Sequence, residues 1–484
     1  NNAVARIAGE SGIAGFGVDP SNGDVLLADL NGQVRRLVSQ AVDTDFPSTL
    51  DATGLFADVT TLTPSAGLVP YDVNLPFWSD HATKRRWFGI PDTVSKFGFD
   101  REGSWSTPAG AVWVKHFDIE MQRGNPSSAK RLETRVLVRN ASGSYGVSYR
   151  WNTPGTQATL VADTGEEFDL SIDVGGTPTI QRWRIPSRAE CSTCHTPQAG
   201  HSLSFRTRQL NRNGQIGPLS GNFIQLLADS GYLQNLDASP LTMAKHVAPD
   251  DAAYSLEARA RAWLDVNCSY CHMDGGTAPA NFDARSSVRL FETDTVNVAP
   301  TSGVLHPDDK LLVPGQEDRS VIVHRSSVRN GYTRMPPLAS SVTDPAGVQL
   351  LKDWINTGLA TRKSLAAWTA QHLGSRPPED QSPDADPDGD GRTNREEFLA
   401  HTNPLLADQG PAPGGNLIGG NFQLTLPALP GRGVRLEHSD DLSDWNLWPG
   451  SGNDGLERSS GAPWQVTVPL SGSRGFYRAV IEER

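Results

Sequence analysis

The sequence predicts a multidomain chain with a β-rich N-terminal domain, a mainly α-helical middle region and a small β-sandwich-like module at the C-terminus. Three observations support this prediction. The chain has 484 residues, enough for roughly three domains of ordinary size. Its 47 glycines and 34 prolines, about one residue in six, indicate many turns and short strands. Strand-like patterns fill the chain before residue 190 and after residue 416, whereas helix-like periodicity is confined to the part between them.

Composition excludes several classes of protein. Hydrophobic residues make up 37% of the chain, which is too many for a disordered protein. No apolar run approaches the roughly 18 to 20 residues that a membrane-spanning helix needs, so no transmembrane segment is expected. The net charge of -12 argues against a nucleic-acid partner.

Residues 1–40 are predicted to form a β-hairpin. Segments 23–29 and 32–38 flank an Asn31-Gly32 turn, which is a strong hairpin signal. The pattern resembles the last blade of a sugar-dehydrogenase-type β-propeller, and a plain hairpin packed on the next domain is the alternative. The sequence begins at Asn1 without a basic and apolar leader, so we expect that a signal peptide was removed or a larger precursor was cut.

Residues 41–190 are predicted to form a β-rich, sandwich-like domain. The strand-forming segments are rich in β-branched and aromatic residues and lie at 112–117, 135–139, 145–151 and 157–161.

Helical segments are predicted further along the chain, at 209–211, 222–232, 255–268 and 344–359. Ser255 is the expected N-cap of the third of these helices. A Pro- and Asp-rich linker follows residue 375. Short strands return at 422–426, 464–468 and 475–480.

Two Cys-x-x-Cys-His motifs contain every cysteine of the chain. The sequence at 191–195 is CSTCH and at 268–272 is CSYCH. This spacing is the attachment signal for c-type haem: two thiols bond the porphyrin edge and the adjoining histidine binds the iron. The motifs therefore predict two covalently attached c-type haems. The residues expected to hold them are Cys191, Cys194, His195, Cys268, Cys271 and His272.

Four cysteines in this pattern have three alternative uses. An even count in an exported chain is also typical of two disulfides. Two Cys-x-x-Cys pairs can form a zinc site, although zinc does not require a histidine after each pair. Two redox-active dithiols are the third alternative, but a βαβ context is missing around both motifs.

The second motif carries a further resemblance. A helix at 255–268, the motif itself, Met335-Pro336-Pro337 and a helix at 344–359 together resemble a class I cytochrome c domain, which we place at 251–362. The resemblance implies that Met335 supplies the sixth iron ligand through its thioether, opposite His272. A gap-filling core role is the alternative for Met335.

The first haem region is placed at 191–250, and its distal ligand is open. The candidates are His81, His116, His201, His246 and Met243. His116 is favoured, because strand alternation at 112–117 could direct it inward. A five-coordinate iron is also open.

The stretch from about 60 to 360 resembles a poorly characterised family of periplasmic or surface di-haem proteins. Members are often fused behind a sugar-dehydrogenase-like propeller, in keeping with residues 1–40. The matching segments are LPFWSD at 75–80, WVKHF at 113–117, LETR at 132–135, YRWN at 149–152, PSRAE at 186–190 and QLNR at 209–212.

The linker at 363–405 contains an EF-hand-like loop at 386–397. Carboxylates fall at loop positions 1, 3 and 5, a glycine stands where the chain must turn, position 7 offers a carbonyl and position 12 is a glutamate. The loop predicts a Ca²⁺ site; a solvated acidic linker is the alternative. The expected ligands are Asp386, Asp388, Asp390, Arg392 through its carbonyl, and Glu397. Residues 406–484, the C-terminal β module, resemble small β domains of bacterial surface proteins around segment 436–445.

These observations favour an electron-transfer protein of the periplasm or cell surface, which passes electrons between a dehydrogenase and another redox carrier. Self-association into a haem-to-haem assembly or filament is a variant of this reading. A di-haem peroxidase-like enzyme with an open first haem, and a surface-binding protein that uses its β modules, are the alternatives. No catalytic residue is predicted.

Overall fold

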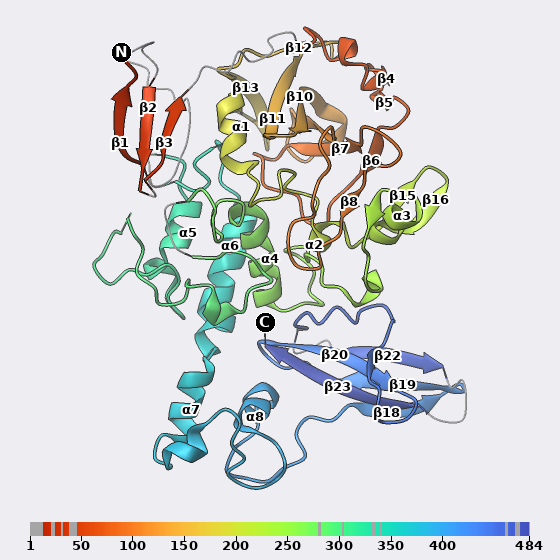
Figure 1. The fold of residues 1–484 in the computed structure, drawn as a ribbon, viewed down its shortest axis with the longest axis vertical. Helices are drawn as coiled ribbons and strands as arrows, with labels where there is room; N and C mark the ends of the chain where they lie inside the picture. Colours follow the sequence, from red (N-terminus) through yellow and green to blue (C-terminus); the bar gives the residue numbers. More distant parts are fainter. Residues whose placement is uncertain are drawn as a thin grey trace.

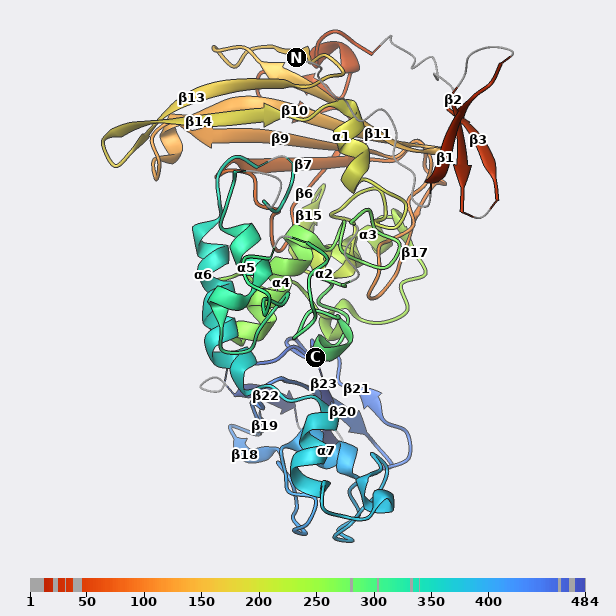
Figure 2. The same cartoon turned by 90° about the vertical axis from the view of Figure 1, so that its left-hand side faces the viewer.

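The computed structural model describes residues 13–20, 25–30, 32–37, 46–278, 282–302, 304–330, 334–338, 340–459, 463–469 and 475–483. The chain is multidomain and strand-rich, with several small sheets, as the sequence predicted. Figures 1 and 2 show a broad layer of strands at one end with α1 beside it, the helices α2 to α6 below it, and a second group of strands at the other end. Within the described part of the chain, no helix has the length and apolar character to cross a membrane.

The first strands form a small antiparallel sheet in the order β1-β2-β3, which stands to one side of the broad layer (Figure 1). Its strands are β1 (Ile13–Val18), β2 (Val25–Asp29) and β3 (Val34–Leu37). The predicted pairing of two strands after residue 22 is confirmed, because Val25 faces Leu37 and Ala28 faces Val34. The predicted turn residue Asn31 lies outside the described residues.

The broad layer is a six-stranded antiparallel sheet in the order β12-β11-β10-β9-β7-β6. Its strands are β6 (Val69–Tyr71), β7 (Thr83–Gly89), β9 (Val112–Glu120), β10 (Ala129–Asn140), β11 (Gly143–Trp151) and β12 (Ala158–Leu160). The strands predicted at 112–117, 135–139, 145–151 and 157–161 all lie in this sheet. Three of them are longer than predicted.

The two faces of this sheet have different covers. One face packs under β4 (Phe56–Asp58), β5 (Thr63–Pro64) and η1 (Asp51–Thr53), around Trp87 and Val114. The other face meets the hairpin of β13 (Glu166–Val174) and β14 (Thr177–Ile185) around Phe117. Further along the same face, Trp113 packs into an apolar cluster with Phe205 from the helical region. Side chains alternate between the faces along each strand, so this division fixes which residues of β9 can reach the helices.

The middle region contains the predicted helices. Its helices are α1 (Arg188–Cys194), α2 (Thr207–Leu210), α3 (Phe223–Asp229), α4 (Leu256–Cys268), α5 (Val321–Ser326) and α6 (Pro345–Asp353). Its short strands are β8 (Phe97–Gly98), β15 (Asn213–Ile216), β16 (Leu219–Asn222) and β17 (Leu233–Gln234). Short 3-10 turns are η2 (Pro126–Ser128), η3 (Pro240–Thr242), η4 (Leu290–Glu292) and η5 (Glu317–Arg319). Ser255 caps α4 as predicted, because its side chain accepts from the amide of Ala258 at 3.1 Å.

Helix α6 closes the core of this region against α4. Asp344 caps α6 and also accepts a 2.8 Å hydrogen bond from the indole of Trp263 on α4. The helix continues through a π-turn, η6 (Trp354–Gly358), and a 3-10 turn, η7 (Leu359–Thr361). The predicted helix at 344–359 is therefore confirmed in extent, with a change of helical type after Asp353.

The last part of the chain starts with α7 (Leu365–Leu373), η8 (Pro378–Gln381) and α8 (Asn394–Ala400). Two three-stranded sheets follow, in the orders β18-β19-β22 and β21-β20-β23. Their strands are β18 (Gly414–Ile418), β19 (Asn421–Leu426), β20 (Arg432–Ser439), β21 (Asn446–Leu447), β22 (Trp464–Pro469) and β23 (Phe476–Glu483). Both sheets contribute to one apolar cluster, which includes Leu426 and Leu436.

A turn at 78–81 joins the broad sheet to the helical region. The backbone amide of Trp78 donates to Asn267 on α4 at 2.9 Å, and its indole donates to the carbonyl of Val342 at 2.8 Å. Asp80, only 3% exposed, accepts from the hydroxyl of Ser340 and from the amides of Ser341 and Val342. The turn therefore holds both α4 and the loop that precedes α6.

Replacing Asp80 with Ala should lower the free energy of unfolding by about 2 to 4 kcal/mol, because two backbone amides and a hydroxyl lose their acceptor in a buried place. Denaturant unfolding monitored by tryptophan fluorescence measures this loss. Asp92→Ala is the matched control: Asp92 also accepts from two backbone amides, but in an exposed local turn. Equal losses in the two variants would contradict the joining role of Asp80.

Candidate functional site

The first motif is carried by helix α1, which starts with a capping box. The Ser187 side chain accepts from the amide of Glu190 at 3.1 Å, and the Glu190 carboxylate accepts from the amide of Ser187 at 2.8 Å. This reciprocal cap fixes the start of a short helix that would be marginal alone. Cys191 and Cys194 then lie one turn apart on α1, and His195 ends the helix.

Helix α1 lies against strand β11 at Gly146. A Cβ atom at this position would stand 3.0 Å from the Sγ atom of Cys191, which is closer than real Cβ atoms approach a neighbour without displacement. The glycine therefore allows the first thiol to lie directly on the sheet.

His195 is held in one orientation. Its Nδ1 lies 2.6 Å from the carbonyl oxygen of His201, which can only accept, so Nδ1 is the donor. Burial lowers the pKa of the ring to about 4. A neutral ring with its proton on Nδ1 keeps its lone pair on Nε2, the state that a metal-ligating histidine requires.

The second motif starts at the last residue of α4. His272 is 9% exposed, and its ring stacks on Phe282 with centroids 4.1 Å apart. Burial, together with the charge of Arg325, lowers the pKa of His272 to about 4. Within the described residues its buried Nδ1 atom has no hydrogen-bond partner, in contrast to Nδ1 of His195.

Arg325 links Met335 to the second motif, because it interacts with both. Its amide donates to the carbonyl of Arg325 at 2.9 Å, and its carbonyl accepts from Arg329 at 3.1 Å. The charge of Arg325 acts on His272. The backbone of Met335 is thus fixed from both sides, while its ligand role stays a prediction.

The structure brings the two motifs together. The thiols of Cys194 and Cys271 lie close enough to act on each other's pKa, although 77 residues separate the two motifs in the chain. Their interaction lowers the pKa of Cys271 and, with burial, raises that of Cys194. Next to them, the hydroxyl of Thr277 donates to the carbonyl of Thr193 at 3.0 Å. All four thiols are free and partly exposed.

A four-thiolate zinc site does not match this arrangement. Among the described residues, the one place where three or more His, Cys, Asp or Glu ligand atoms lie within 4.8 Å of one another is an aspartate group in the linker. Two thiols meet between the motifs, but no third ligand atom joins them at that distance.

A row of cations faces the first motif. Arg86 on β7, Lys115 on β9 and Arg135 on β10 stand directly opposite one another across three adjacent strands. Burial, with the charges of Arg86 and Arg135, lowers the pKa of Lys115 to about 7. The charges of Lys115 and Arg135 also act on His195 and on the Cys194 thiol.

His116 faces the opposite way from Lys115. Its Nδ1 lies 2.7 Å from the hydroxyl of Thr134 and its Nε2 lies 3.1 Å from the carboxylate of Asp118. Its ring packs edge-on to Trp151, on the sheet face away from the first motif. The expectation that His116 binds the first haem therefore does not match its placement: side chains alternate along a strand, and Lys115 occupies the inward position.

The other candidate ligands of the first haem also have roles in the structure. His201 supplies the carbonyl for His195, and its ring lies 3.2 Å from Ser144. His81 packs edge-on to Trp78. His246 is 3% exposed and its Nε2 lies 3.8 Å from Asp265. Met243 is buried at 1% exposure.

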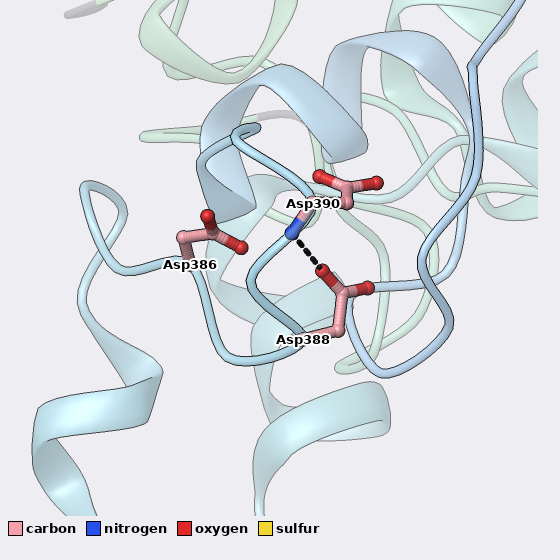
Figure 3. A group of neighbouring side chains, drawn as sticks. All are labelled: Asp386, Asp388 and Asp390. Carbon is pink, nitrogen blue, oxygen red and sulfur yellow. Dashed lines mark hydrogen bonds between the residues drawn. The ribbon is translucent and has the colours of Figure 1, made fainter.

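The predicted calcium loop forms a compact turn in front of α8. One carboxylate oxygen each from Asp386, Asp388 and Asp390 lies within 4.8 Å of the others. Figure 3 shows the three side chains around one loop, with the amide of Asp390 donating to Asp388 at 3.1 Å. Glu397 lies on α8 and is completely buried, and the charges of Asp388 and Asp390 act on it.

No protein-family model matches the chain, and comparisons with curated proteins and with solved structures found no match.

Sequence reasoning missed the cation row and the contact between the motifs. The row has little local signal, because Trp113 and Val114 are both apolar and lie on opposite faces of β9, so the sequence leaves the parity of Lys115 open. The Cys194–Cys271 contact has no local signal, since it depends on how α1 and α4 pack in three dimensions.

A short thiol-to-thiol cross-linker should join Cys194 to Cys271 in the protein before any group is attached to its cysteines, because the two motifs adjoin at Thr193 and Thr277 and these two thiols interact. Peptide mass spectrometry identifies the linked pair. Cys191→Ser should leave the product intact, whereas Cys271→Ser should abolish it. Linkage within one motif, in place of linkage between the motifs, would contradict the arrangement.

Proposed function

We propose that the protein is an extracytoplasmic di-haem c-type cytochrome that transfers electrons between a dehydrogenase and another redox carrier. The observation that carries the proposal is the meeting of two Cys-x-x-Cys-His motifs, which are joined by the Thr277–Thr193 hydrogen bond and by the interaction of Cys194 with Cys271. Attachment points that adjoin each other favour electron exchange between the two groups they would hold. The resemblance of segments in 60–360 to di-haem proteins, and of 251–362 to class I cytochromes c, belongs to this proposal.

The residues present fit the cofactor. The free thiols of Cys191, Cys194, Cys268 and Cys271 would hold two haems, and haem supplies reversible one-electron chemistry at its iron when bound. The carbonyl of His201 fixes His195 with Nε2 available for a metal. His272 would bind the iron of the second haem, and Met335 is the expected second ligand. A thioether ligand raises the reduction potential relative to a second histidine.

Lys115 and Arg135 have a positioning role in this proposal. Haem carries two propionate carboxylates, and a partly buried cation is stabilised by an anionic partner. Arg135 already pairs with Glu133 at 2.6 Å, whereas no ion pair of Lys115 occurs among the described residues. Within this row, Lys115 is therefore the cation that we expect to pair with a propionate of the cofactor.

Location and partners follow from the cofactor. Covalent c-type haem is attached outside the cytoplasm, so the proposal places the protein in the periplasm or at the cell surface. Its partners are redox proteins, with self-association into a haem-to-haem assembly as a variant. The proposal also assigns two domains. The middle of the chain is a helical haem region, and the sheets of β18 to β23 form a C-terminal sandwich-like module.

One observation favours a second candidate function. His116, the ligand first expected for haem one, is engaged at both ring nitrogens. An exchangeable sixth position at the first iron would favour a peroxidase-like enzyme. A cyanide-induced spectral shift with peroxide turnover supports that enzyme, whereas an iron that does not respond to cyanide supports electron transfer alone.

Pyridine haemochrome analysis of the exported protein should give two c-type haems per chain. Removing both thiols of one motif, by Cys191→Ser with Cys194→Ser, should leave one haem, because the second motif has its own attachment residues. The reciprocal pair, Cys268→Ser with Cys271→Ser, is the matched variant. A wild-type protein with no covalent haem would overturn the proposal.

Lys115→Met should lower the midpoint potential of one haem by roughly 50 mV, because a buried positive charge beside the first motif destabilises ferric iron relative to ferrous iron. Burial and the neighbouring cations hold the pKa of Lys115 at about 7, and a propionate partner would raise it, so the charge would be present at neutral pH and lost only at higher pH. The wild-type potential should therefore fall towards the variant's only as pH rises above 7. Redox titration at several pH values measures both effects.

Lys130→Met is the control for this substitution, because Lys130 is an exposed lysine of the same sheet. Its potential should equal that of the wild type. An equal shift in both variants would show a general charge effect and contradict the positioning role of Lys115.

A further inference from the structure

The aspartate loop at 386–390 is held in a closed shape by its own backbone. The two carboxylate oxygens of Asp386 accept from the amides of Gly389 and Gly391, each at 2.9 Å. Gly389 and Gly391 have φ values of 77° and 93°, a region that favours glycine, so the chain can turn tightly around the carboxylates. Three negative side chains are thereby brought within 4.8 Å of one another. The guanidinium of Arg392 lies 3.6 Å from Asp390 and balances part of this charge.

A second observation points to an ion at this place. Glu397 on α8 is 0% exposed, and its Oε2 atom has no hydrogen-bond partner among the described residues. The Oδ2 atom of Asp388 is buried and equally without a partner. Burial, with the charges of Asp388 and Asp390, raises the pKa of Glu397 to about 7. Buried carboxylate oxygens without partners are costly, and a bound cation removes that cost.

We propose that Asp386, Asp388, Asp390 and Glu397, with the backbone carbonyl of Arg392, bind one Ca²⁺ ion. The ligands are all oxygen atoms, and a glutamate that follows a loop of carboxylates can give two of them. Such a set suits the six to eight oxygen ligands of Ca²⁺ better than the strict octahedron of Mg²⁺, which keeps most of its water. The proposal is independent of the haem motifs.

The ion would fix a contact that reaches the helical region. Glu397 lies on α8, and the guanidinium of Arg432 on β20 donates to the carbonyls of Phe398 and Leu399 at the end of that helix. The neighbouring amide of Gly431 donates to Glu457 at 2.6 Å. The backbone carbonyl of Glu457 in turn accepts from the amide of Ser255, the N-cap of α4.

This series of contacts gives the site a structural function. Calcium would hold α8 in place, α8 would hold β20 through Arg432, and the segment around Glu457 would stay on the start of α4. A calcium-loaded joint would therefore fix the last strands against the helix that ends in Cys268.

Isothermal titration of the full-length protein, first stripped with a chelator, tests the proposal with calcium chloride as the probe. We expect one binding event per chain with a Kd between about 10⁻⁶ and 10⁻³ M, and a melting temperature that rises with calcium. Hydrogen exchange should slow in α8 and β20. Asp388→Asn and Glu397→Gln should each weaken binding at least tenfold.

Asp384→Asn is the matched control, because Asp384 is an exposed aspartate of the same linker outside the ligand set. It should bind calcium as the wild type does. Circular dichroism of each variant at millimolar calcium confirms that it is folded. The proposal is overturned by an absence of binding heat at millimolar calcium, by unchanged affinity in both ligand variants, or by Mg²⁺ binding as tightly as Ca²⁺.

Discussion

A row of buried positive charge sets the main constraint on this structure. Arg86, Lys115 and Arg135 project from three adjacent strands towards the same side of the sheet. Like charges repel each other strongly where they are partly buried. The pKa of Lys115 is lowered by burial and by this repulsion. Glu133 balances Arg135 and Asp72 pairs with Arg86 at 3.1 Å, whereas Lys115 has no ion pair within the described parts of the chain. The first motif lies against this face, so the positive potential of the row acts on its thiols and on its histidine.

The position of the two motifs depends on elements far from either of them. Gly146 lets α1 approach β11, and the turn at 78–81 ties α4 and the loop before α6 to the sheet. The Thr193–Thr277 hydrogen bond then joins the motifs directly. The contact between Cys194 and Cys271 is therefore a product of tertiary packing around α4. This explains why segment 75–80, which has no cysteine or histidine of a motif, is part of the site's support.

Local patterns predicted the elements well and their packing poorly. The capping serine and the apolar periodicity of α4 act over a single helix, so sequence reasoning found its start and end. The sequence also predicts strand β9, but it leaves open which face is inward, and a shift of one residue exchanges the two faces of a strand. His116 was expected inside for that reason, whereas Trp113 and Phe117, with the parity of Lys115, mark the inward face. Helix α1 has only seven residues, too few to show helical periodicity in the sequence. Ser187 and Glu190 form its capping box and are its one local signal.

With every cysteine placed in a motif, the junctions between the parts of the chain rely on other forces. Helix α4 illustrates them. Near its start, Glu257 is 4% exposed and pairs with Arg362 at 3.0 Å; two turns later, Asp265 is 3% exposed and pairs with Arg206 at 3.3 Å. A buried ion pair adds little net stability, because desolvation offsets most of the attraction, but a buried carboxylate without its partner is strongly unfavourable. The two arginines come from opposite directions along the chain, one after α6 and one before α2. Any other packing of either segment would leave a buried carboxylate without its partner. The two pairs therefore fix the position of the helix that ends in Cys268.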